Sequence, residues 1–195
     1  MMSKRERHTF VVYVEDKPGV LNRVASLFRR RAFNIESLTV GQCEETPSES
    51  RMTIVVETDS IGARRLEANL YKLVNVVRVH DITDVPAIYR ELAMVKVSTT
   101  TDTRTHIMQL VDVFRARVVD VAPESLVIET TGTEDKIEGL LEVLAPYGIL
   151  ELVRTGRVGM VRGKRSTVVD PADLSSELRD DDDEADDDPN VSYSV

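Results

Sequence analysis

The feature that most constrains the fold is an order of predicted elements that occurs twice along the chain. Alternating or β-branched apolar residues predict four strands in the first half, at residues 8–14, 34–41, 51–57 and 76–82. They predict four more in the second half, at residues 91–98, 117–122, 125–130 and 149–155. In each half, apolar residues three or four positions apart predict a helix after the first strand and another after the third. The period of this repeat is about 80 residues.

Each half therefore predicts an α+β fold, a ferredoxin-like βαββαβ unit, and the chain contains two of them in tandem. We expect an N-terminal unit at 8–82, a connector at 83–90 containing Pro86, a C-terminal unit at 91–165 and a tail at 166–195. Both helices of such a unit cover the same face of its sheet, so the other face needs a partner. The small core of each unit also favours a homodimer.

Acidic charge is concentrated at the end of the chain. The formal net charge is −9, and residues 170–195 hold eleven Asp or Glu and one Arg, so the rest is close to neutral. The run Asp180–Asp188 (DDDDEADDD) is dense in like charges, which repel and stay solvated. We expect a disordered, solubilising tail; weak cation binding and contact with a basic partner are the alternatives. An acidic tail argues against a nucleic-acid partner, which requires clustered positive charge.

The composition argues against a membrane protein or a secreted one. The longest apolar run, Phe10–Val14, is much shorter than the roughly 20 residues of a membrane-spanning helix. The first residues, MMSKRERHTF, are basic but are not followed by the apolar region of a signal peptide. Cys43 is the single cysteine, which excludes an internal disulfide and a cysteine-based metal cluster. We therefore expect a soluble, cytoplasmic protein.

Residues that commonly carry catalysis are not grouped in the sequence. The three histidines, His8, His80 and His106, show no triad or metal-binding spacing, and we interpret each as a surface or strand-edge residue. Cys43 lies in a polar loop beside two glutamates and is interpreted as an inert thiol. The glycine-rich segment Gly156–Gly163 opens no predicted helix, so we expect a terminal extended segment instead of a phosphate loop. We predict no catalytic and no metal site on this chain.

The junction between the first strand and the first helix is more informative. Its residues Asp16–Leu21 (DKPGVL) place Pro18 in the expected first helical turn, with Gly19 beside it. Free N–H groups at a helix start attract a carboxylate, and Gly19 lets a ligand approach the backbone. Asp16 or Asn34 could accept hydrogen bonds from an ammonium group. The helix start and these side chains together suit a zwitterionic amino acid. A Pro-Gly turn that binds nothing is the alternative on local grounds.

Several sequence blocks carry a family resemblance in the same order. They are Asp16–Leu21, 33–40 (FNIESLTV), Arg51–Ile54, 70–76 (LYKLVNV), 90–97 (RELAMVKV), 114–121 (FRARVVDV) and Gly156–Gly163. Taken together, they resemble the small, regulatory subunits of acetolactate synthase (acetohydroxyacid synthase). The N-terminal unit then resembles an ACT domain, an amino-acid-sensing ferredoxin-like module, and the C-terminal unit resembles an ACT-like regulatory domain. The tail lies outside the resemblance.

This resemblance implies regulation without chemistry of its own. In the family, a separate large subunit binds thiamine diphosphate, Mg²⁺ and FAD. It joins two pyruvates, or pyruvate and 2-oxobutyrate, in branched-chain amino acid biosynthesis. The small subunit raises that activity and makes it sensitive to feedback by valine, and in some members by leucine or isoleucine. The resemblance thus implies the large subunit, a second copy and a branched-chain amino acid as partners, and neither nucleic acid nor membrane.

The resemblance also implies an effector site at the interface between two ACT domains. The matching positions here are Asp16, Gly19, Val20, Leu21, Asn22, Asn34 and Ile35. Gly19 and Val20 would offer backbone N–H groups to the effector carboxylate. Asn34 of the facing protomer would help to fix the amino acid.

Three other functions compete with this one. A stand-alone amino-acid sensor with another partner would share the same ACT features. A small hydrolase of the acylphosphatase kind needs an Arg-bearing phosphate loop after its first strand, and the corresponding loop here is acidic. Binding of single-stranded nucleic acid needs stacking aromatics in the middle of the sheet, which the predicted strands lack.

Overall fold

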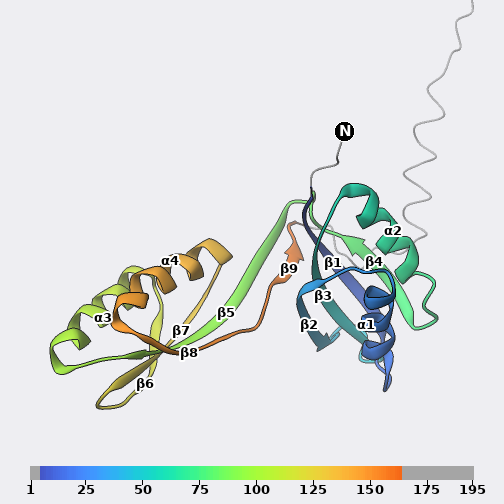
Figure 1. The fold of residues 1–195 in the computed structure, drawn as a ribbon. Coiled ribbons are helices and arrows are strands. Elements are labelled where there is room, and N and C mark those ends of the chain that lie inside the picture. The colour runs from blue at the N-terminus through green and yellow to red at the C-terminus, as the bar shows by residue number, and fades with distance from the viewer. Residues whose placement is uncertain (1–4, 164–195) are drawn as a thin grey trace, which may run out of the picture. The chain divides into compact units, whose positions relative to one another are not determined.

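Four antiparallel strands and two helices form the first half of the computed structural model, which describes residues 5–163. The strands are β1 (Glu6–Glu15), β2 (Ile35–Gln42), β3 (Glu49–Thr58) and β4 (Val76–Asp81). They lie in the order β2-β3-β1-β4. The helices are α1 (Val20–Arg30) and α2 (Ser60–Leu70), and both lie against the same face of this sheet (Figure 1). We call these elements the first module.

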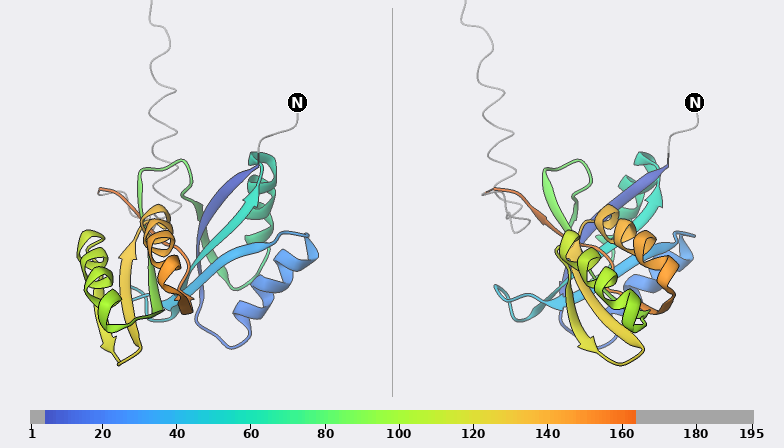
Figure 2. Two further views of the ribbon diagram at one scale, coloured as in Figure 1. Left: turned by 60° about the vertical axis from the view of Figure 1, so that its left-hand side comes forward. Right: turned by 90° about the vertical axis from the view of Figure 1, so that its left-hand side faces the viewer.

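The second half repeats this arrangement, and we call it the second module. Its strands are β5 (Ala87–Ser98), β6 (Arg117–Val121), β7 (Ser125–Gly132) and β8 (Ile149–Arg154), in the order β6-β7-β5-β8. Its helices are α3 (Thr101–Val113) and α4 (Glu134–Leu144), followed by the short 3₁₀ helix η1 (Ala145–Tyr147). Figure 2 shows α3 and α4 together on one face of their sheet. The two predicted ferredoxin-like βαββαβ units are therefore confirmed, and both belong to one compact unit.

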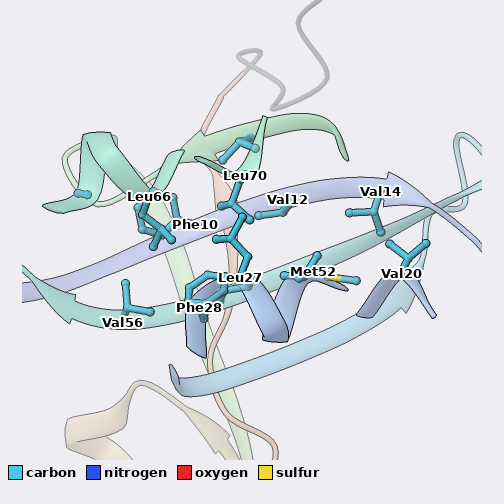
Figure 3. Close-up of a cluster of buried hydrophobic side chains, with 14 residues drawn as sticks. Phe10, Val12, Val14, Val20, Leu27, Phe28, Met52, Val56, Leu66 and Leu70 are labelled. Atoms are coloured by element: carbon cyan, nitrogen blue, oxygen red, sulfur yellow. The ribbon is translucent and has the colours of Figure 1, made fainter. Parts of the chain in front are cut away.

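Each module has its own apolar core between sheet and helices. In the first module, alternate residues of β1 (Phe10, Val12 and Val14) meet the apolar face of α1, including Leu27 and Phe28 (Figure 3). In the second module, alternate residues of β5 and β7 meet α3 and α4 in the same manner. The period of two along the strands and of 3.6 along the helices places these residues on matching faces. The apolar residues whose spacing predicts the helices are therefore the residues that form the two cores.

The far face of the first sheet is covered by a two-stranded ribbon that the sequence did not predict. The segment 87–90, expected in the connector, is the start of β5. It pairs antiparallel with β9 (Val158–Val161), which lies in the segment expected to be extended and terminal. Pro86 precedes β5 and therefore does not interrupt it. Pairing partners about 70 residues apart leave no local pattern, because each short strand is stabilised only by the other.

Two further expectations are corrected by the fold. Pro18 precedes α1 and is not part of its first turn. His8 is neither on the surface nor at a sheet edge: it is 3% exposed in the central strand β1, with Nδ1 2.7 Å from Asp81 Oδ2. The pairing of β1 with β4 brings residue 81 to this position, which local sequence does not reveal. His106 is exposed, as expected, and the predicted tail at 166–195 lies outside the described residues.

Candidate functional site

A tight turn joins β1 to α1 at the predicted ligand-binding junction. The amide of Val20 donates to the carbonyl oxygen of Lys17 at 3.3 Å, which closes a turn with Pro18 and Gly19 at its centre. Gly19 has φ 83° and ψ −5°. These values match the third position of a type II turn, which favours glycine, while proline suits the second position. The Pro-Gly pair is thus explained by the geometry of the turn.

The turn leaves the start of α1 without a side-chain cap. Within residues 5–163, the amides of Gly19, Leu21 and Asn22 have no hydrogen-bond acceptor, whereas the amide of Val20 is used by the turn. A Cβ built on Gly19 would meet no atom within 4 Å, so the approach to these amides is open. The partial positive charge of a helix N-terminus adds to the attraction for an anion. This arrangement suits a carboxylate.

The corresponding helix start in the second module is closed by its own side chains. Thr100 caps α3: its hydroxyl accepts from the amide of Thr103, and the Thr103 hydroxyl accepts from the amide of Thr100 at 2.9 Å. Asp102 adds negative charge in the first turn. This capping box satisfies amides that α1 leaves open. The two modules therefore differ at the same point of the same fold.

The side chains around the start of α1 differ in their exposure and in the groups that they contact. The Val20 side chain is 4% exposed in the core and its amide is used by the turn, so neither group is available to a ligand. Leu21 is 44% exposed and Asn22 is also exposed. Asp16 is tied to β3 and the loop before it, because its Oδ1 accepts from the Ser50 hydroxyl at 3.1 Å and its amide donates to the Ser48 carbonyl at 2.8 Å. The Asp16 carboxylate is thus held beside the turn.

Asn75, which no local sequence pattern indicates, holds the other side of the turn. Its side-chain amide donates to Glu15 Oε2 at 2.5 Å, and its Oδ1 accepts from Arg23 Nη1 at 2.6 Å. Its carbonyl oxygen accepts from the Glu15 amide at 2.9 Å. The hydrogen bond from Asn75, followed by that from Lys17, holds the pKa of the Glu15 carboxyl below its usual value. Residues 60 positions apart make this contact, so no local signal could have revealed it.

Asn34 and Ile35 lie at the opposite end of α1. Ile35 begins β2, and Asn34 precedes it. The eleven residues of α1 separate them from Gly19 by about 16 Å at 1.5 Å per residue. One chain therefore brings together Asp16, Gly19, Val20, Leu21 and Asn22, but not Asn34 and Ile35. A single small ligand cannot touch both groups within one copy.

Other candidate chemistry is sparse in the described part of the chain. Cys43 is buried, with its sulfur 3.7 Å from the Thr46 hydroxyl. No group of three or more His, Cys, Asp or Glu among residues 5–163 could hold a metal ion. No helix in that range is long and apolar enough to cross a membrane.

Comparison with known proteins places both modules in one family. Residues 90–163 match the family model "Small subunit of acetolactate synthase", and residues 10–78 match "AHAS small subunit-like ACT domain". The chain is 50% identical over 158 residues to the acetolactate synthase small subunit of Mycolicibacterium smegmatis, covering 81% of this chain and 92% of that one. It is 49% identical over 159 residues to a probable acetolactate synthase small subunit of Archaeoglobus fulgidus, covering 82% and 99%.

A solved structure agrees with these sequence relatives. The crystal structure of the acetolactate synthase small subunit from Thermotoga maritima superposes with a TM-score of 0.77 at 40% identity. The match covers 82% of this chain and 99% of the other. It thus extends over both modules and not over the ACT fold alone. The chain belongs to the family of acetolactate synthase small (regulatory) subunits and begins with an ACT domain.

Proposed function

We propose that this chain is the feedback-regulatory subunit of an acetolactate synthase, with valine or a related branched-chain amino acid as its effector. It binds the effector at the start of α1, raises the activity of the catalytic large subunit and makes that activity sensitive to the effector. Thiamine diphosphate, Mg²⁺ and FAD belong to the large subunit in this proposal. The product pathway is branched-chain amino acid biosynthesis.

The open start of α1 is the observation that carries the proposal. The amides of Gly19, Leu21 and Asn22 would donate to the effector carboxylate, while the Asp16 carboxylate would attract its ammonium group. The capped start of α3, the corresponding helix of the second module, offers no comparable set of amides, which supports effector binding at α1 and not at α3. A free amino acid carries both a carboxylate and an ammonium group.

A second copy of the chain completes the site in this proposal. Asn34 and Ile35 lie about 16 Å from Gly19 in one copy, so they reach the effector only from a facing protomer. β2, which Ile35 begins, is an edge strand of the first sheet. An edge strand has unpaired backbone groups available to another chain. We therefore propose a homodimer formed through the first modules.

The expected energies suit a metabolic sensor. A regulator must release its ligand at cellular concentrations, so a Kd between about 1 μM and 1 mM is appropriate. Coupling of about 1–3 kcal/mol between effector site and catalytic subunit would change activity about 5–150-fold. Leucine and isoleucine differ from valine by one methylene, which is worth about 1–3 kcal/mol, so the choice among them is modest.

Calorimetry with valine tests the site directly. We expect saturable heat with the unmodified chain, and a Kd at least about 100-fold weaker for Gly19→Asp, because charge-assisted hydrogen bonds to the effector carboxylate would be lost. Gly163→Asp is the matched control. Gly163 also has a positive φ, 78°, and open space around its Cβ position, but it lies beyond β9.

The same proteins are then assayed with the large subunit, as pyruvate turnover with and without valine. The proposal is wrong about the effector site if the unmodified chain shows no binding heat, or if Gly19→Asp binds valine normally. It is wrong about the partner if the large subunit neither co-purifies with the chain nor gains activity from it.

A further inference from the structure

A β-bulge interrupts β2 directly after a residue of the proposed effector site. In the pairing with β3, Ile35 lies opposite Val56 and Ser37 lies opposite Val55, so Glu36 is an extra residue without a partner. Bulges redirect side chains away from the regular alternation of a strand. Here Glu36 Oε2 lies 2.9 Å from Nε of Arg7 on β1. The bulge thus connects the start of β2 to Arg7.

Arg7 in turn binds the second module. Its Nη1 lies 2.7 Å from both carboxylate oxygens of Glu134, the first residue of α4. Glu134 also accepts from Arg157 Nη2 at 3.1 Å. Arg157 lies between β8 and β9, with its guanidinium carbon 5.0 Å from the centre of the Tyr89 ring. One guanidinium, that of Arg7, therefore joins a carboxylate of each module.

A second set of contacts starts at the same bulge. The Ser37 hydroxyl accepts from the backbone amide of Arg157 at 3.1 Å. The Thr39 hydroxyl, also on β2, donates to the Arg157 carbonyl at 3.4 Å. β2 is thus bonded to the segment that enters β9. Because Arg157 also donates to Glu134 of α4, a movement at the start of β2 would reach the second module through both routes.

The ion pairs of this network contribute little to folding stability and have room to change partners. Its side chains are partly exposed, 27% for Glu36, 49% for Arg7 and 28% for Glu134, and ion pairs of this kind contribute little to folding. They border a cavity of about 440 Å³, which leaves room for Arg7 to exchange partners. Two carboxylates share one guanidinium, so a shift of Glu36 changes how firmly Arg7 holds Glu134.

We propose that Glu36 is a positioning residue that transmits the state of the effector site, through Arg7, to α4 of the second module. The inference rests on the proposed function, because it takes effector binding at Asn34 and Ile35 as the event that moves the start of β2. It adds the route by which that event leaves the first module. Glu36 itself does not touch the effector.

The test measures effector binding and inhibition of the large subunit separately. Glu36→Gln and Glu134→Gln are each assembled with the large subunit, and valine Kd is measured alongside the inhibition of pyruvate turnover at saturating valine. We expect Kd to stay within threefold of the unmodified chain while the inhibition ratio falls at least fivefold. Glu129→Gln is the matched control: Glu129 is 21% exposed and lies 2.7 Å from Arg117, within the second module's sheet. It should keep full inhibition.

Each other outcome has a distinct meaning. Normal inhibition in Glu36→Gln overturns the route through Glu36, and normal inhibition in Glu134→Gln overturns the step from Arg7 to α4. A weaker Kd with proportionally weaker inhibition makes Glu36 part of the effector site and also overturns it. If the unmodified chain itself binds no valine, the proposed function fails and the route falls with it, and this failure is visible without any variant. Two variants are used so that a folding defect in one leaves the other decisive.

Discussion

The two modules share one fold but begin their first helices in opposite ways. α1 follows a Pro-Gly turn, and its first amides are left open beside Gly19. α3 follows a run of threonines, and Thr100 and Thr103 satisfy each other's amides. A ferredoxin-like unit is therefore stable with either kind of helix start. The open start in the first module is a local choice of residues, and not a requirement of the fold.

The sheets of the two modules differ on their far faces as well. In the first sheet, Val11 and Val55 point away from the helices, yet they are 0% and 3% exposed. The ribbon of β5 and β9 contributes to this cover, since Arg51 on β3 donates to the carbonyl of Gly159. In the second sheet, Met94 and Val153 occupy the far face and are 39% and 47% exposed. The expected partner for the first sheet's far face is thus supplied by the chain itself.

The largest expected effect comes from crowding the ribbon. A Cβ on Gly159 would lie 2.8 Å from the Ile82 side chain and 2.9 Å from the Tyr89 ring, whose hydroxyl is held by the Ile82 carbonyl at 2.6 Å. Gly159→Val should therefore lower the free energy of unfolding by about 1–3 kcal/mol, measured by urea unfolding. Gly41→Val, at a strand glycine with no atom within 4 Å of its Cβ position, should change it by less than about 0.5 kcal/mol. Equal effects would mean that the ribbon does not pack on the first sheet.

The next largest effects on stability are expected at the two helix starts. Thr100→Ala removes the cap of α3 and should cost about 1 kcal/mol of folding stability without altering valine binding. Gly19→Ala forces alanine into a positive φ and should cost about 1–2 kcal/mol. It should also weaken valine binding, because a methyl group then stands near the open amides. Thermal unfolding and calorimetry with valine are measured on both variants. Loss of valine binding in Thr100→Ala would contradict effector binding at the start of α1.

The smallest effect lies where the modules meet. The hydrogen bond from Arg7 holds the pKa of Glu134 below its usual value. A carboxyl whose pKa is lowered by folding contributes stability above the unfolded-state pKa, about 4.3, and loses it as the pH falls through the folded-state pKa. The free energy of unfolding of the unmodified chain should thus be about 0.2–1 kcal/mol higher than that of Glu134→Gln at pH 7. Urea unfolding from pH 7 to pH 3 should show this difference shrink. A constant difference would place the effect of the substitution elsewhere.

Much of the fold could be predicted because its determinants are local. Val24, Leu27 and Phe28 repeat at helical spacing and form one buried face of α1. Alternation along β3 predicted which of its residues face the core. The ribbon could not be predicted, because β9 has only four residues and pairs with a strand that follows a proline. The burial of His8 could not be predicted for the same reason, since its partner Asp81 is brought near by strand pairing.

The candidate site shows the same division. Gly19 is visible in the sequence as a residue that lets a ligand approach the backbone, whereas Pro18 is expected in the first helical turn and lies instead in a type II turn before α1. Asn75, Ser50 and Arg7 are not visible, because their partners are distant in sequence and their side chains have no characteristic spacing. Their contacts depend on the sheet register, which forms only when both strands are buried together.

The sequence by itself determined the repeated βαββαβ order, the Pro-Gly pair before the first helix and the family of the chain, because these depend on residue type, spacing and short blocks. Only the tertiary structure decided that β9 covers the first sheet, that Glu36 stands in a bulge, and that Arg7 joins the two modules. Those features are pairings between segments separated by tens to more than a hundred residues. Their free energy exists only after the chain has closed the loops between them.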